Sequence, residues 1–499
     1  MGALDEGCFE VDVGNDVKLG IMSVCEDLDD GEEVLEEDGG IAVIEDAVKV
    51  LLQGLGEDVN REGLKKTPLR VAKALCDGTR GYKQKVKDIV DGALFPEAGV
   101  DSRIGHAGGA GGLVVVRGLD LFSYCESCLL PFKVRCHVGY IPSGQRVVGL
   151  SKLSRVSDVF ARRLQNPHRL ANEISAALYN SIRPAGVAVF LQCWHIQFPE
   201  EEDGHAQVFS SEEMHGWKEV PVRAGSGVFE DEKSNVWTDF SALLKFKGVN
   251  IEKAQVKQPV YQSWCIAGSK ELCNGHGAKN GFNSRNATKP GGTNQSAMTS
   301  AAISILHALG EDPSRAGLAG TPHRFIQWLT NFKRSSLELK PSLFGNPNSG
   351  WQSHNGNGKI KNLGNGYMSN LCSELNLPFW SQCEHHLLPF QGVVHIGYIA
   401  DEEQVVVERS SMQSLVHFYG YHLQVQERLT RQIAESVYSV FSRGVIVVVE
   451  ANHICMISRG IEKVGSSTAT IAVLGHLASD SEAKAKFLQT VSKRSASGS

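Results

Sequence analysis

Internal repetition is the feature that most constrains how this chain of 499 residues can fold. SYCESCLLPF at 123–132 returns as SQCEHHLLPF at 381–390, and GVAVFLQCWHIQF at 186–198 returns as GVIVVVEANHICM at 444–456. Both pairs are offset by about 258 residues, far more than the repeat length of a solenoid unit. The sequence therefore predicts two tandem domains that arose by duplication.

The composition between the repeats suggests the domain limits. We expect an acidic flexible tail over 1–40, a first domain over 41–240, a linker over 241–295 and a second domain over 296–492. The tail is rich in Asp and Glu, and the linker is rich in Gly, Asn and Lys without apolar periodicity. A second Gly/Asn-rich stretch, 345–370, is interpreted as a loop insertion.

Apolar patterns predict both helices and strands in each copy. Helical spacing begins at Ile41, and Thr67 followed by proline predicts the N-cap of a second helix. Runs of β-branched residues predict strands over 112–125 and 134–142. A further helix is expected over 151–167 and beyond.

The overall composition excludes several classes of protein. The net charge is −6 and the hydrophobic content is 42%, which suit a globular protein and give no reason to expect nucleic-acid binding. No apolar run reaches the roughly 20 residues that a membrane helix needs. The acidic N-terminus resembles neither a signal peptide nor a transit peptide, so we expect a cytoplasmic protein with no membrane partner. In a reducing compartment the 12 cysteines are core residues or metal ligands rather than disulfides.

The second copy contains a set of residues that could bind zinc. Cys383 and His386 are three residues apart, and Cys455 lies at the end of a predicted strand. Two thiolates and one imidazole are a common zinc ligand set that leaves a coordination position open for water. His385 and His453 flank these ligands and could move protons. Any one of these residues alone would more often be a core residue, but their combination predicts a metal site.

The first copy has lost part of this set. It keeps Cys125 and His195, but Gln197 replaces the second zinc cysteine and Ser127 replaces the first histidine. Cys128 could coordinate a metal together with Cys125, yet two thiolates and a glutamine are a poor ligand set. We therefore expect no zinc in the first copy.

The first copy instead keeps groups that suit a phosphate. Ser151, Lys152 and Arg155 fall at a predicted helix start, where hydroxyl and cationic groups favour anion binding. Arg70 and Lys73 lie one helical turn apart in the preceding helix. The second copy has serines opposite the first three of these residues. A solvated basic helix start is the alternative interpretation.

CEHHLLPF, LQVQERLT, EANHICM and SRG together resemble GTP cyclohydrolase I, and the tandem arrangement is similar to the two-domain form found in plants. The resemblance covers roughly 41–235 and 296–490. It implies an α+β protein of two tandem T-fold (tunnelling fold) domains, each with N-terminal helices and an antiparallel sheet backed by two helices. It also implies ring-like homo-oligomers. The implied reaction converts GTP and water to 7,8-dihydroneopterin triphosphate and formate, the first step of tetrahydrofolate synthesis.

The resemblance also implies roles for individual residues. One zinc ion per chain would be bound by Cys383, His386 and Cys455 and would activate water to attack carbon 8 of the purine. Proton transfer would fall to His385 and His453.

Other residues would bind the substrate. Glu427, with Gln426 beside it, would recognise the guanine edge, and Arg459 would contact the triphosphate. The phosphate-type residues of the first copy match the family's phosphate-binding positions: Ser151, Lys152, Arg155, Arg70 and Lys73.

The catalytic set is thus divided between the two copies. Because the active site of this family lies between subunits, we expect the second domain to supply chemistry and base recognition while a first domain, of the same or a neighbouring chain, binds the triphosphate. Three alternatives stay open: a non-catalytic zinc-stabilised T-fold protein that binds nucleotide or regulates a partner, an enzyme acting on another pterin or purine, and a zinc finger that binds nucleic acid. The acidic balance disfavours the last.

Overall fold

The computed structural model describes residues 34–96, 112–143, 146–196, 217–251, 265, 292–338, 371–400, 407, 409–458 and 467–496. The acidic tail up to residue 33, most of the predicted linker and the predicted insertion at 345–370 lie outside these ranges. We call the described residues 34–251 the first half and 292–496 the second half.

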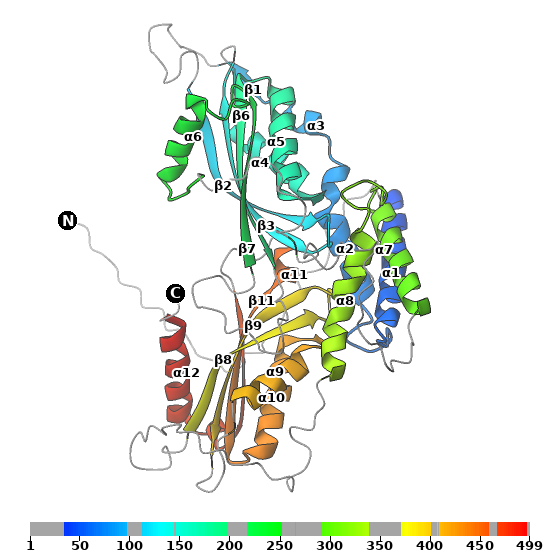
Figure 1. Ribbon diagram of the computed structural model, residues 1–499, viewed down its shortest axis with the longest axis vertical. Coiled ribbons are helices and arrows are strands. Elements are labelled where there is room, and N and C mark those ends of the chain that lie inside the picture. The colour runs from blue at the N-terminus through cyan, green and yellow to red at the C-terminus, as the bar shows by residue number, and fades with distance from the viewer. Residues whose placement is uncertain are drawn as a thin grey trace, which may run out of the picture. The chain divides into compact units, whose positions relative to one another are not determined.

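The first half begins with helices and continues as a sheet (Figure 1). Its strands form the order β5-β2-β3-β6-β7, parallel between β5 and β2 and antiparallel elsewhere. The large elements are α1 (Val34–Gly54), α2 (Thr67–Gly78), β2 (Val114–Cys125), β3 (Pro131–Ile141), α4 (Leu150–Ala161), α5 (Pro167–Ile182), β6 (Gly186–Ile196), β7 (Trp217–Gly227) and α6 (Asn235–Lys245). Short elements are η1 (Arg80–Tyr82), α3 (Val86–Val90), β1 (Leu94–Pro96), β4 (Arg146–Val148) and β5 (Leu164–Gln165).

The second half repeats this plan with the strand order β10-β8-β9-β11-β12. Its large elements are α7 (Gly292–Ala308), α8 (Thr321–Glu338), β8 (Leu371–Cys383), β9 (Pro389–Ile399), α9 (Arg409–Gly420), α10 (Gln426–Val440), β11 (Gly444–His453), β12 (Thr468–Gly475) and α12 (Ser481–Ala496). Short elements are β10 (Leu423–Gln424), α11 (Ile454–Ile457) and η6 (His476–Ala478). The predicted α+β class with two tandem T-fold domains is confirmed, since each half has a five-stranded sheet backed by a helix pair, α4 with α5 and α9 with α10 (Figure 1).

Two local predictions were wrong. The helix expected over 151–167 and beyond is two helices, because the chain breaks after Ala161 to pair Leu164 and Gln165 with β2. Pro167 then occupies the first turn of α5, where its missing N–H has no helical partner to lose. The expected N-cap, Thr67, is already inside α2, and the N-cap residue is Lys66.

A third helix covers the opposite face of each sheet. Trp237, Phe240 and Leu244 of α6 pack with Phe190 of β6 in a separate buried cluster. In the second half Ala483, Phe487 and Val491 of α12 do the same against Ile446 and Val448 of β11. Spacings of three and four residues place these apolar side chains on one helical face. Both sheets are therefore partly buried on two sides.

One hydrophobic core extends through both halves. Ile44 and Leu51 of α1 belong to the same buried cluster as Ile305 of α7. A Cβ on Gly54 would lie 2.4 Å from the Met298 side chain, so α1 and α7 approach closely. The N-terminal helices of the two halves thus pack against each other, beside the turns that hold the repeated cysteine motif.

No helix in the described part of the chain is both long enough and apolar enough to cross a membrane.

Candidate active site

The turn after β8 arranges the CEHH motif. Leu388 O accepts from the backbone N–H of Cys383 at 2.9 Å, and the Leu387 N–H donates to Cys383 O at 2.9 Å. Leu387 adopts a left-handed conformation with φ 56°. These contacts close a tight turn that places Cys383 and His386 on the buried side and leaves His385 half-buried.

Cys383, His386 and Cys455 form a buried cluster whose potential ligand atoms all lie within 4.8 Å of one another. Cys455 reaches the cluster from α11, directly after β11, and Cys383 Sγ lies 3.7 Å from His386 Nδ1. Contact with the Cys455 thiol, and with His386 and His453, holds the pKa of Cys383 well below its usual range, against the opposing effect of burial. A thiolate beside a second thiol and an imidazole is the donor set that zinc binds, so these residues fit the metal.

A hydrogen-bond network fixes the orientation of His453. Gln426 is buried, and its Nε2 donates to Val449 O at 3.0 Å and to Thr468 O at 2.9 Å. Its Oε1 therefore faces His453 Nε2, 2.8 Å away, and must accept a hydrogen bond from the N–H at that position. The ring of His453 also stacks on Phe390, with centroids 4.4 Å apart and planes 10° apart. Gln426 thus uses all its polar atoms inside the protein and sets the tautomer of His453.

A cation from the first half acts on His385. Burial lowers the pKa of His385, and the nearby positive charge of Arg70 lowers it further, while Cys383 and Glu384 oppose the change. Arg70 is exposed and lies in the first turn of α2. One predicted phosphate-binding residue of the first half is therefore within electrostatic range of a predicted catalytic histidine of the second.

The start of α2 is held on the CEHH turn by direct hydrogen bonds. Thr67 Oγ1 donates to the backbone oxygen of Glu384 at 2.7 Å. The buried Glu384 carboxylate accepts from Arg61 Nη1 at 2.8 Å and from Arg428 Nη2 at 2.6 Å. Burial raises the pKa of this carboxyl, but Arg428 and Arg61 outweigh it and keep the pKa below its usual range. This explains why threonine stands at the helix start: its hydroxyl binds the other half.

The duplication repeats this contact in the opposite direction. Thr321 of α8 donates to the backbone oxygen of Glu126, in the turn of the first half. The Glu126 carboxylate accepts from Arg315 Nη1 at 2.7 Å and from Arg169 Nη1 at 3.2 Å. Trp328 Nε1 donates to the backbone oxygen of Cys128 at 3.0 Å. Each half therefore supports the cysteine turn of the other.

We expect Glu126→Gln to lower the free energy of unfolding by about 2 kcal/mol, because the buried carboxylate that pairs with both Arg315 and Arg169 loses its charge. Urea denaturation of the full chain measures this. The matched control is Glu435→Gln, whose exposed carboxylate lies 3.8 Å from Arg431 and should cost less than about 0.5 kcal/mol. Equal costs for the two substitutions would show that the cross-half ion pair does not stabilise the fold.

The remaining predicted residues occupy separate positions. Glu427 is exposed in the first turn of α10, and Lys73 is exposed on α2. Ser151, Lys152 and Arg155 lie on α4, which packs on β2 and α5, and Ser151 and Arg155 are exposed. Among the described residues, no hydrogen bond or ion pair joins these three side chains to the second half. Arg459 lies outside the described residues.

The first half also contains a cluster of potential metal ligands, at its own copy of the cysteine motif. Cys125, Cys128 and His195 are buried, and their potential ligand atoms lie within 4.8 Å of one another and of the Cys265 sulfur. Gln197, which the sequence placed in this set, lies outside the described residues. The expectation of a poor ligand set omitted Cys265, because that cysteine has no counterpart in the repeat and lies about 70 residues after His195.

Comparisons with known proteins agree with the motifs. The family model for GTP cyclohydrolase I matches residues 44–212 and 298–492. The chain is 55% identical over 500 residues to GTP cyclohydrolase 1 of Solanum lycopersicum, with all of both chains covered. It is 52% identical over 493 residues to GTP cyclohydrolase 1 of Arabidopsis thaliana, covering 98% of this chain and 97% of that one. The similarity to GTP cyclohydrolase 1 of Dictyostelium discoideum is 46% over 153 residues, or 31% of this chain and 61% of the relative.

Proposed function

The chain belongs to the GTP cyclohydrolase I family, and we propose that its active site is composite, with chemistry from the second half and triphosphate binding from a first half. The enzyme hydrolyses GTP to 7,8-dihydroneopterin triphosphate and formate. The full-length relatives bear the name of this enzyme, so the non-catalytic alternative is set aside.

The second half supplies the reacting groups. Cys383, His386 and Cys455 would hold the zinc ion, which would supply an activated water for attack on the purine. His385, half-buried beside this set, accepts and returns protons on the solvent side. His453 donates a hydrogen bond from its Nε2–H to Gln426. Its other nitrogen, Nδ1, is offered to the substrate.

Base recognition is assigned to Glu427 alone. Its exposed carboxylate at the start of α10 can accept from both the ring N–H and the exocyclic amine of guanine, which adenine does not present together. Gln426 is a positioning residue for His453, because its amide is already bound within the protein. Arg459 remains assigned to the triphosphate on sequence resemblance.

The hydrogen-bonded contact between the start of α2 and the CEHH turn, which brings the charge of Arg70 within range of His385, is the observation that supports the composite site most directly. Arg70 is exposed, and its charge acts on His385 across the contact between the halves. Thr67, three residues earlier, is bonded to the turn that precedes His385. A guanidinium at this position, with Lys73 one turn further along α2, would suit the phosphates of a substrate bound at the zinc set.

We expect Arg70→Ala to lower kcat/KM for GTP by about 30- to 100-fold, mainly through KM, because a charge-assisted contact to a phosphate contributes about 2 to 3 kcal/mol. The assay is pterin fluorescence after oxidation of the product. Lys65→Ala is the matched control, since that exposed lysine is paired with Glu62 and should leave the kinetics unchanged. If both variants showed the same kcat/KM, Arg70 would have no part in binding GTP.

The remaining assignments follow from this chemistry. GTP is the substrate partner, and further copies of the chain form a homo-oligomer. One catalytic zinc ion is bound per chain, in the second half. A reducing compartment such as the cytosol suits a site whose ligands are thiolates.

A further inference from the structure

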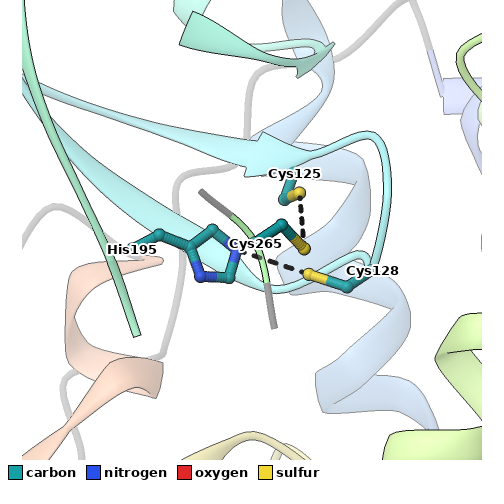
Figure 2. Close-up of side chains that lie close together, drawn as sticks. All are labelled: Cys125, Cys128, His195 and Cys265. Atoms are coloured by element: carbon teal, nitrogen blue, oxygen red, sulfur yellow. Dashed lines mark hydrogen bonds between the residues drawn. The ribbon is translucent and has the colours of Figure 1, made fainter. Parts of the chain in front are cut away.

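We propose that the first half binds a second, structural zinc ion through Cys125, Cys128, His195 and Cys265 (Figure 2). These residues come from three parts of the chain. Cys125 ends β2, Cys128 lies in the turn that follows, His195 is on β6, and Cys265 lies in the stretch between the halves.

Two of the distances between the ligand atoms match those of a tetrahedral site. Zn–S bonds of about 2.3 Å and a Zn–N bond of about 2.0 Å place the ligand atoms of a tetrahedron about 3.5 to 3.8 Å apart. The Cys125 and Cys265 sulfurs are 3.7 Å apart, and Cys128 Sγ is 3.4 Å from His195 Nε2. Figure 2 shows the three sulfurs and the ring nitrogen facing one another, with contacts between Cys125 and Cys265 and between Cys128 and His195. A Cys₃His set is a common ligand set of structural zinc sites.

The histidine is oriented as a zinc ligand. His195 Nδ1 lies 2.7 Å from Ile196 O, and because a carbonyl only accepts, this nitrogen bears the proton. Nε2 therefore directs its lone pair toward the sulfurs. Such a backbone contact on the far nitrogen is the usual way in which a ligating imidazole is held.

The residue that fixes the histidine ring in the second half is replaced in the first half. His453 donates its Nε2 proton to Gln426, whereas the matching position beside His195 is Pro167, which has no side-chain acceptor. His195 consequently turns Nε2 to the cysteines. In addition, the Ser127 backbone N–H donates to Cys125 Sγ at 3.3 Å, a contact that stabilises a thiolate in the CxxC turn.

Four protein ligands distinguish this site from the one in the second half. A set of three ligands leaves a coordination position for water, whereas a closed set of four leaves none and contributes to stability instead. All four residues are buried, with Cys265 the most exposed at 5%. The site would fasten the chain between the halves to the sheet of the first half, and it would raise the expected content of one zinc per chain to two.

The test is the zinc content of the full chain, which is purified under reducing conditions and measured by inductively coupled plasma mass spectrometry. We expect about two zinc ions per chain in the wild type and about one in each of Cys125→Ser/Cys128→Ser, which leaves one thiolate and one imidazole in the first half, and Cys455→Ser. The variant that combines these three substitutions should contain almost none. Cys193→Ser is the matched control, because Cys193 is a buried cysteine of β6 outside the cluster, and it should keep both ions.

The Cys455→Ser chain keeps the proposal testable if Cys125→Ser/Cys128→Ser does not fold. Its first half is unchanged, so it should retain about one zinc per chain. After exchange for Co²⁺ it should show the intense sulfur-to-cobalt charge transfer and visible bands of a tetrahedral site with several thiolates. These readouts do not depend on turnover, so they stand apart from the composite active site.

Two results would overturn the second zinc site. One is a wild-type chain with a single zinc that disappears completely in Cys455→Ser. The other is a Cys125–Cys265 disulfide, found by mass spectrometry of peptides from the chain purified with its thiols blocked.

Discussion

Cys455→Ser should abolish the release of formate from GTP, with a loss on the order of a thousandfold or more, because activation of water at neutral pH depends on the metal. Cys455 closes the buried set whose ligand atoms lie within 4.8 Å of one another. Serine leaves only one thiolate and one imidazole at this position, and the hydroxyl is a weak zinc ligand. Formate and pterin product are measured on the same samples.

Cys372→Ser is the control for this substitution. Cys372 is on β8, the strand that also ends in Cys383, but it belongs to no metal cluster among the described residues. Its activity should stay within about twofold of the wild type, as for substitutions away from the reacting groups. Substantial turnover by Cys455→Ser with no zinc in the second half would contradict the assignment of this site.

The sequence predicted the fold well because the duplication supplied the evidence twice. Repeated apolar strands and the constant offset between motifs led to two similar sheets, in which the CEHH turn joins β8 to β9 and β9 pairs with β11, the strand before Cys455. The break between α4 and α5 was missed because β5 is only two residues long, too short for a period-2 pattern. The helices α6 and α12 were missed because the first lies at the expected domain limit and neither contains a motif.

Contacts between distant segments could not be predicted from one sequence. Thr67 has the appearance of a helix cap, and only the fold shows that its hydroxyl binds Glu384 in the other half. Cys265 has no spacing relation to Cys125, so its place beside that sulfur depends on the path of the chain. Gln426 likewise stands next to Glu427 in sequence, yet its side chain turns inward to His453.

The two cysteine turns explain how a duplicated site can be divided without losing the fold. Both turns keep a buried glutamate that binds an arginine from each half. Stability therefore depends on features common to both copies, while the metal ligands were free to diverge. In the second half the set remained open for chemistry, and in the first half a fourth ligand became available.

Among the phosphate-binding residues proposed for the composite site, Lys152 is expected to contribute most to activity. We expect Lys152→Ala to lower kcat/KM for GTP by about 100- to 1,000-fold, because binding of the non-reacting triphosphate positions the purine for reaction. The matched control is Ser411→Ala at the corresponding helix start of the second half, where no phosphate role is proposed. Zinc content should be unchanged in both variants, which separates lost substrate binding from lost metal.

Mixing two inactive chains tests where Lys152 acts. Lys152 shares no described ion pair or hydrogen bond with the zinc set of its own chain, so we expect it to serve a neighbouring one. When Cys455→Ser and Lys152→Ala chains with different tags are co-expressed and purified through both tags, a site that combines an intact second half with an intact first half can form between them. Random assembly should restore about a quarter of the wild-type activity. Absence of rescue in a verified mixed oligomer would place the whole site within one chain, because each chain would then contain one defect in every site it forms.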